Sequence, residues 1–217
     1  MSIPNHNLEP KASSSDLRGR IFQKLHYTRL NIASTITSVL NRFTWTLRGV
    51  QFAGSARFYG FAKAQRFPGS VISIENGCTF RSDKYSNLIG VNRHCIISTH
   101  SPNAVIKIGK NSGFSGVTIG CLSSITIGDD VLVGANVIIT DFDWHDVHPL
   151  KRRIGSGGTK PVVINNNVFI GVNSVIWKGV TIGENSVIGA NSLVTKNVPP
   201  NTIYGGNPAK IIKVLSD

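Results

Sequence analysis

A short segment past the middle of the chain combines carboxylates with two histidines. It reads Asp-Phe-Asp-Trp-His-Asp-Val-His over residues 141–148. Side chains alternate along an extended chain, so Asp141, Asp143 and His145 are expected to point the same way. A carboxylate beside an imidazole fixes the tautomer of the ring and raises its basicity. The segment therefore predicts a general base, with His145 as the base and Asp143 as its partner.

The second histidine of this segment, His148, is the alternative base. On residue types alone, a surface loop with two histidines is more often a solvated polar segment than a catalytic one. The catalytic interpretation therefore depends on the scaffold that carries the loop.

The scaffold is indicated by apolar residues that recur every six positions. Such a period fits neither the helical repeat near 3.6 nor the strand alternation of 2. It is typical of a hexapeptide β-helix, in which each short strand forms one side of a triangular coil. Three hexads close one turn, so residues eighteen apart are expected to stack. The series is Ile164, Ile170, Ile176, Ile182, Ile188 and Val194.

The period breaks where the histidines lie. Ile127, Val133 and Ile139 are in register, but the next member, Ile164, follows 25 residues later instead of six. Residues 141–161 are therefore predicted to be a loop that projects from the wall of the solenoid. Long loops on rigid scaffolds commonly carry function.

The rest of the chain divides around this all-β solenoid. Residues 1–48 are interpreted as a polar tail followed by a basic amphipathic helical segment, with Asp16 capping a helix from about Leu17. Residues 49–198 form the predicted β-helix domain. Residues 199–217 are predicted to cap the last coil, because a solenoid needs its end covered.

The positive charge is concentrated near the N-terminus. The chain has 23 Lys and Arg against 11 Asp and Glu, and residues 1–66 hold ten of the former but two of the latter. This excess could attract an anionic membrane surface, an anionic glycan or nucleic acid. Nucleic acid is the weakest choice, because stacking aromatics are not interleaved with the basic residues. Residues 17–48 are expected either to contact a membrane peripherally or to pack on the solenoid end or a neighbouring subunit.

The number and spacing of the cysteines indicate the cellular compartment of the protein. Cys78, Cys95 and Cys121 form no CxxC pair, and their odd number argues against a disulfide framework. They are expected to be small buried residues inside the coil. The sequence has no apolar run long enough to span a membrane and no apolar signal-peptide core. A cytoplasmic location is expected, at the inner membrane surface if residues 17–48 bind it.

Several motifs together carry a resemblance to a known family. The chain resembles the hexapeptide-repeat acyltransferases with a left-handed parallel β-helix, in the branch of maltose, galactoside and surface-polysaccharide O-acetyltransferases. The likeness covers residues 49–215 and rests on the order and spacing of its motifs. These are GFSGVTI at 113–119, IITDFDWH at 138–145, PVVI at 161–164, VFIG at 168–171, GVTIG at 179–183, VIGA at 187–190, VTK at 194–196 and GGNPAK at 205–210.

The resemblance implies an acetyl-CoA-dependent O-acetyltransferase that modifies a sugar hydroxyl, in a surface polysaccharide or its precursor. It implies a homotrimer with active sites between subunits, acetyl-CoA as co-substrate and no metal. His145 matches the family's catalytic base, and Ser115 and Asp143 match positions near the acceptor pocket. Positions that match the CoA channel are Gly171, Ala190, Thr195, Lys196 and Lys210.

Two departures from the family pattern matter. His148 stands where many relatives have an acidic residue, which keeps it open as the base. Residues 1–48 do not match the small helical domain of maltose-type enzymes, which favours the surface-polysaccharide branch.

Other functions remain open on this scaffold. A sugar-nucleotide N-acyltransferase or a xenobiotic acetyltransferase would need the same base. A zinc hydratase of the γ-carbonic-anhydrase type needs three histidines on facing coils of adjacent subunits, and a non-catalytic β-helix needs none. Histidines available to the hydratase are His94, His100, His145 and His148.

Overall fold

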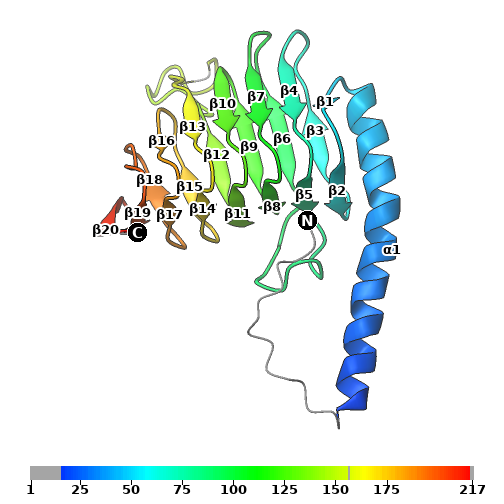
Figure 1. The fold of residues 1–217 in the computed structure, drawn as a ribbon. Coiled ribbons are helices and arrows are strands. Elements are labelled where there is room, and N and C mark those ends of the chain that lie inside the picture. Colours follow the sequence, from blue (N-terminus) through cyan, green and yellow to red (C-terminus); the bar gives the residue numbers. More distant parts are fainter. Residues whose placement is uncertain (1–15, 156, 216–217) are drawn as a thin grey trace.

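A computed structural model describes residues 16–155 and 157–215. The predicted polar tail, residues 1–15, lies outside the described residues. One long helix, α1 (Leu17–Leu47), is followed by short strands that wind into a left-handed solenoid, and the helix lies across its first coil (Figure 1).

Three sheets form the three sides of the solenoid, and the chain visits them in the fixed order A, B, C. Sheet A contains β1 (Gln51–Phe52), β4 (Val71–Ile74), β7 (Val105–Ile108), β10 (Ser124–Ile127), β13 (Val162–Ile164) and β16 (Thr181–Ile182). Sheet B contains β2 (Ala56–Tyr59), β5 (Cys78–Arg81), β8 (Gly113–Ser115), β11 (Leu132–Ala135), β14 (Phe169–Ile170), β17 (Val187–Ile188), β19 (Thr202–Gly206) and β20 (Ala209–Val214). Sheet C contains β3 (Lys63–Gln65), β6 (Ile96–Thr99), β9 (Thr118–Cys121), β12 (Ile138–Thr140), β15 (Val175–Ile176) and β18 (Leu193–Val194).

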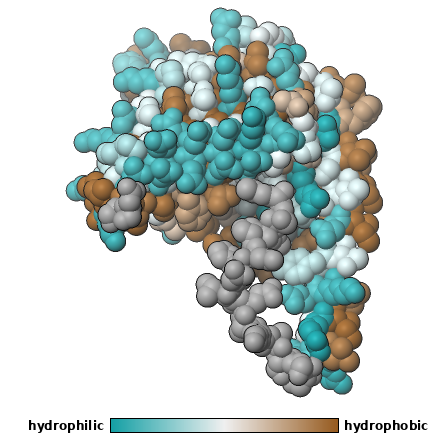
Figure 2. Space-filling model, in the orientation of Figure 1, coloured by the Kyte–Doolittle hydropathy of each residue, from teal (hydrophilic) through white to brown (hydrophobic). Residues whose placement is uncertain are grey.

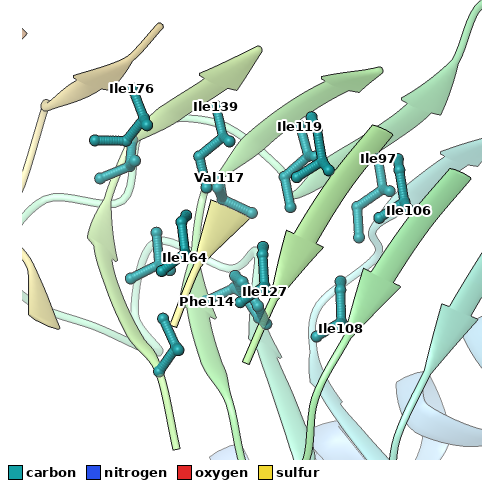
Figure 3. Close-up of a cluster of buried hydrophobic side chains, with 14 of the residues drawn as sticks. Ile97, Ile106, Ile108, Phe114, Val117, Ile119, Ile127, Ile139, Ile164 and Ile176 are labelled. Carbon is teal, nitrogen blue, oxygen red and sulfur yellow. The ribbon is translucent and has the colours of Figure 1, made fainter. Parts of the chain in front are cut away.

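The interior consists of columns of apolar side chains, one from each coil. The predicted stacking of residues eighteen apart is confirmed, because Ile164 pairs with Ile182, Ile170 with Ile188 and Ile176 with Val194. All six side chains are fully buried. Figure 3 shows earlier members of these columns, among them Ile97, Ile119 and Ile139 (Figure 3).

The predicted interruption of the coil is also confirmed. Ile127 pairs with Ile164, 37 residues further on, and Ile139 pairs with Ile176. The strands on either side of the loop therefore stack as if the inserted residues were absent.

Asparagines build many of the corners between sheets. Eight non-glycine residues adopt positive φ among the described residues, and seven of them are asparagine. Asparagine tolerates this left-handed conformation better than other side chains. At the corner between sheets A and B the amides also bond coil to coil, from Asn167 to Asn185 and from Asn185 to Asn201, at 2.9 Å each.

The helix α1 covers the open end of the first coil. Its predicted cap is confirmed, since Asp16 Oδ1 accepts a hydrogen bond from Gly19 N at 2.8 Å. Trp45 is fully buried, with its ring centroid 5.1 Å from that of Phe58. The expected packing of this segment on the end of the solenoid is therefore confirmed. Within the described residues, no helix is long and apolar enough to cross a membrane.

The coil ends later than the sequence predicts. Val198 still bridges to Ile182 on the side of sheet A, and β19 pairs in parallel with β17, so sheet B continues past residue 198. The strand β20 then returns antiparallel along β19. Pro199 and Pro200 do not end the coil because they fall at a corner, where proline's missing N–H removes no ladder hydrogen bond.

The cysteines occupy the interior, as predicted. All three are free and fully buried. Burial raises the pKa of Cys78 to about 11 and raises the pKa of Cys95. These thiols are therefore protonated and unreactive at neutral pH.

The interior columns give a direct stability test. Ile108→Ala should lower the free energy of unfolding by about 2–5 kcal/mol, because it leaves a cavity between stacked coils. Lys107→Ala, on the exposed face of the same strand, should change it by less than about 0.5 kcal/mol. Chemical unfolding followed by circular dichroism measures both. Equal losses in the two variants would contradict the column packing.

Candidate active site at the loop and the solenoid corners

The loop 141–161 leaves the solenoid after β12 and returns at β13, at the corner between sheets C and A. Its two arms run antiparallel, with a bridge between Phe142 and Thr159. Asp143 exchanges backbone hydrogen bonds with the other arm, to Gly158 O at 3.2 Å and from Gly157 N at 3.0 Å. The base of the loop is therefore a defined hairpin-like projection.

Asp141 anchors this projection to the preceding coil. Its buried carboxylate accepts the backbone N–H groups of Leu122, Ser123 and Ser124, each at 2.7 Å. The Ser123 hydroxyl adds a fourth hydrogen bond at 2.9 Å. A carboxylate so fully satisfied holds the corner closed. The expectation that Asp141 shares a face with His145 is wrong, because the chain bends into the loop here and strand alternation is lost.

Asp143 pairs with a lysine from the following coil. Its carboxylate forms an ion pair with Lys178, whose ammonium also donates to Gly158 O at 3.1 Å. The two side chains are 14% and 22% exposed. The expected Asp143–His145 pairing is therefore replaced by a link between the loop arm and the solenoid wall. Lys178 occupies the position equivalent to Asp141 one coil later, because Ile139 pairs with Ile176. The six-residue register could therefore have predicted that Lys178 lies beside the base of the loop.

His145 lies exposed further along the loop. Its Nδ1 is 3.0 Å from the backbone carbonyl oxygen of Arg152. A carbonyl can only accept, so Nδ1 carries a proton, and in the neutral ring the lone pair is on Nε2. This is the tautomer of a general base that acts through Nε2, oriented by a carbonyl instead of the expected carboxylate. The alternative base, His148, is also exposed, and its backbone N–H donates to Asp146 Oδ1 at 2.8 Å.

An aromatic cluster supports the loop from below. The ring centroids of His100 and Trp144 are 4.9 Å apart, and those of Phe142 and Trp144 are 4.8 Å apart. The indole lies so close to Gly120 that a Cβ there would sit 2.5 Å from it. His100 stands two coils below the loop, and its backbone N–H donates to Cys121 O of the intervening coil at 2.8 Å. Sequence reasoning considered His100 only as a zinc ligand, yet it supports the loop.

The other predicted site residues lie at two corners of the solenoid. Thr195 and Lys196 follow β18, at the same C–A corner as the loop, and both are exposed. Ser115 ends β8, and Gly171 and Ala190 follow β14 and β17, so all three lie at the B–C corner. Lys210 pairs there with Gly205 of β19. Gly171 packs tightly on the next coil, since a Cβ on it would lie 2.6 Å from Ala190 N. Ser115 Oγ accepts a hydrogen bond from Asn87 Nδ2 at 3.1 Å.

Within the described part of a single chain, the histidines available to the zinc alternative do not form a cluster. Across residues 16–155 and 157–215, no group of three or more His, Cys, Asp or Glu side chains could hold a metal ion. His94 lines a cavity of about 880 Å³ beneath α1, whereas His100 packs under the loop.

Comparison with known proteins agrees with this architecture. The pattern described as the hexapeptide repeat of succinyl-transferase matches residues 107–141 and 161–196, and so omits the loop. Residues 107–141 and 161–196 of this chain therefore match a hexapeptide-repeat pattern. The resemblance seen in the sequence is therefore confirmed.

Curated relatives are similar to this chain over part of its length. The galactoside O-acetyltransferase of Escherichia coli (strain K12) is 45% identical over 114 residues, which are 52% of this chain and 55% of the relative. The polysialic acid O-acetyltransferase of Escherichia coli O1:K1 / APEC is 39% identical over 120 residues, 54% of this chain and 38% of the relative. The chain thus spans about half the length of the curated relatives it matches.

A solved structure is similar over nearly the whole of this chain. It is a hexapeptide-repeat-containing acetyltransferase from Vibrio cholerae O1 biovar eltor, solved in complex with acetyl coenzyme A. It is 26% identical, covers 94% of this chain and 92% of its own, and has a TM-score of 0.53. The predicted β-helix is therefore similar to the fold of that acetyltransferase, which was solved with acetyl coenzyme A bound.

The cluster under the loop predicts a pH effect on stability. Desolvation lowers the pKa of His100, against the opposing charge of Asp141. Its folded-state pKa lies below the unfolded value of about 6.5, so the unfolded chain binds the proton first as pH falls. Stability should therefore be full above about pH 7 and decline on acidification through pH 6. Melting temperatures of wild type and His100→Gln from pH 8 to pH 5 should show a shallower decline in the variant; parallel curves would contradict this.

Proposed function

We propose that this chain is an acetyl-CoA-dependent O-acetyltransferase acting on a sugar hydroxyl of a surface polysaccharide or its precursor. The similar galactoside and polysialic acid O-acetyltransferases support this activity and acceptor class. The similar acetyltransferase solved with acetyl coenzyme A supports the co-substrate. The single observation that carries the proposal is the His145 ring, held through Nδ1 by the Arg152 carbonyl with Nε2 left basic.

The reaction would be a direct transfer. His145 Nε2 takes the proton of the acceptor hydroxyl as its oxygen attacks the thioester carbonyl carbon. The tetrahedral oxyanion then collapses, the carbon–sulfur bond breaks, and the imidazolium returns its proton to the departing CoA thiolate. Because the three cysteines are buried and protonated, a cysteine-bound acyl intermediate is disfavoured. Asp143 would act as a positioning residue, since its ion pair with Lys178 ties the arm that carries His145 to the solenoid.

We infer that each active site lies between two subunits of a homotrimer. The proposed acceptor and CoA residues Ser115, Gly171, Ala190 and Lys210 line the B–C corner, whereas His145, Thr195 and Lys196 belong to the C–A corner. Two corners of one triangular coil are separated by its core. The two sets would meet where the B–C corner of one chain faces the C–A corner of the next, and such a heterologous contact closes into a ring.

Several surface features support this seam. The loop exposes Val147, Leu150 and Ile154, each between 75% and 84%, as expected of side chains that reach a neighbouring subunit. Lys196 and Lys210 would meet CoA phosphates as point charges. Three unpaired thiols support action in the cytoplasm, at the inner membrane surface when residues 17–48 are in contact with it.

His145 is tested by substitution. His145→Ala should lower turnover about 10²–10⁴-fold, as loss of a general base does, with little change in folding because the side chain is exposed. Release of free thiol from acetyl-CoA with a panel of sugar acceptors measures the rate. His148→Ala is the matched control and should stay within about threefold of wild type. The opposite ranking would move the base to His148.

The intersubunit seam is tested by mixing inactive chains. Ala190→Arg should block CoA at the B–C corner, and His145→Ala should remove the base at the other corner. If random trimers form on refolding an equal mixture, about a quarter of the seams should be intact and activity should return to that level. A mixture of His145→Ala and Asp143→Ala places both lesions on one loop and should stay inactive. If the first mixture is also inactive, or the wild type has the mass of one chain, the seam is wrong.

A further inference from the structure

The amphipathic pattern of α1 is inverted with respect to the solenoid it covers. The buried residues of the helix are Ser34, Asn41 and Trp45. Its contact with β2 consists largely of hydrogen bonds, including Thr37 Oγ1 to Phe58 O at 2.7 Å and Phe58 N to Ser38 Oγ at 2.8 Å. Apart from Trp45 and the half-buried Leu30, the helix therefore packs through polar and small side chains.

Nine large apolar residues of α1 lie on the opposite side of the helix. On a helical projection they fall within an arc of about 100°, centred away from the buried residues. All are between 43% and 71% exposed. We call this set the outer stripe: Ile21, Phe22, Leu25, Ile32, Ile36, Val39, Leu40, Phe43 and Leu47.

The outer stripe faces away from every coil. Figure 1 shows α1 running across the end of the solenoid beside β1 and β2, and Figure 2 shows apolar side chains along its outer edge (Figure 1, Figure 2). A trimer of side-by-side solenoids would use the lateral faces of the coils. It would leave the stripes of all three subunits open at one end of the assembly.

The charge on this segment indicates what covers the stripe. Residues 16–48 contain six basic residues against a single acidic one, Asp16. A second copy of α1 laid against the first would bring like charges together, which opposes end-to-end pairing. An anionic lipid surface complements both features, because it accepts apolar side chains at the level of its headgroups and attracts lysine and arginine.

We propose that the outer stripe of α1 is a membrane-docking surface that lies in the interface of an anionic bilayer. The helix rests parallel to the membrane plane, and the solenoid extends away from it. At about 1.5 Å per residue, the 31-residue helix offers a docking edge of about 46 Å. In a trimer three such helices would bind together, which increases avidity. This deepens the membrane contact proposed for residues 17–48 and does not depend on the acetyltransferase activity.

Vesicle binding by the full chain tests the proposal. Wild type should sediment with vesicles of phosphatidylcholine and phosphatidylglycerol, bind pure phosphatidylcholine at least tenfold more weakly, and lose affinity in high salt. Ile32→Glu with Ile36→Glu places two carboxylates in the stripe and should weaken binding at least tenfold. The matched control, Asn31→Glu with Thr35→Glu, makes the same charge change on exposed residues beside the stripe and should cost less than about threefold.

Further measurements separate failure of this proposal from other failures. Both double variants should melt within a few degrees of wild type, because the replaced residues are exposed, and both should keep wild-type acetyl transfer to a lipid-free sugar. Equal vesicle binding by the two double variants, or no binding by wild type, would overturn the docking surface. So would a lipid-free mass of wild type twice that of the stripe variant, since a second copy would then cover the stripe.

Discussion

Each coil of this protein must place its apolar side chains directly over those of the coil before it. Ile127 lies under Ile164 and Ile139 under Ile176, although 37 residues separate the members of each pair. Parallel ladders on three sides and closely packed columns inside leave little room for extra residues within a strand. β11 accommodates only a single-residue bulge between Val133 and Ala135. Additional chain can therefore leave the solenoid only at a corner. This constraint explains why the histidine loop begins where β12 ends and why the coil after it is unchanged.

A projecting loop needs its own anchor, because it lies outside the interior columns. Asp141 supplies one by closing the corner through three backbone N–H groups of the preceding coil. Lys178 supplies another from the following coil through Asp143. The contacts of Trp144 with His100 and Gly120 tie the loop to the two coils below it. The arm that leads to His145 is thus held from the coil below and the coil above, which is the preorganisation a positioned base requires.

Sequence periodicity predicted the parts of the structure that repeat. The columns from Ile164 to Val194, the loop and the helix cap at Asp16 all follow from spacing or residue type. The contacts inside the loop did not follow, because strand alternation was applied to Asp141, Asp143 and His145 where the chain bends. Lys178 was missed although it stands one coil beyond Asp141 in the same register. The end of the coil was placed too early because Pro199 and Pro200 suggested an exit, whereas a corner accepts proline.

The helix shows why composition alone could not assign its faces. A basic amphipathic helix at the end of a solenoid would ordinarily turn its apolar side inward. Here the first coil is already filled by Trp45 and Phe58, and the remaining groups at its edge are backbone donors and acceptors such as Phe58 N and O. Serine, threonine and asparagine satisfy those groups, so the polar side of α1 faces the solenoid and the apolar side faces outward. The backbone groups at the edge of the first coil need polar partners, and the polar side of α1 supplies them. For this reason the apolar stripe points away from the protein.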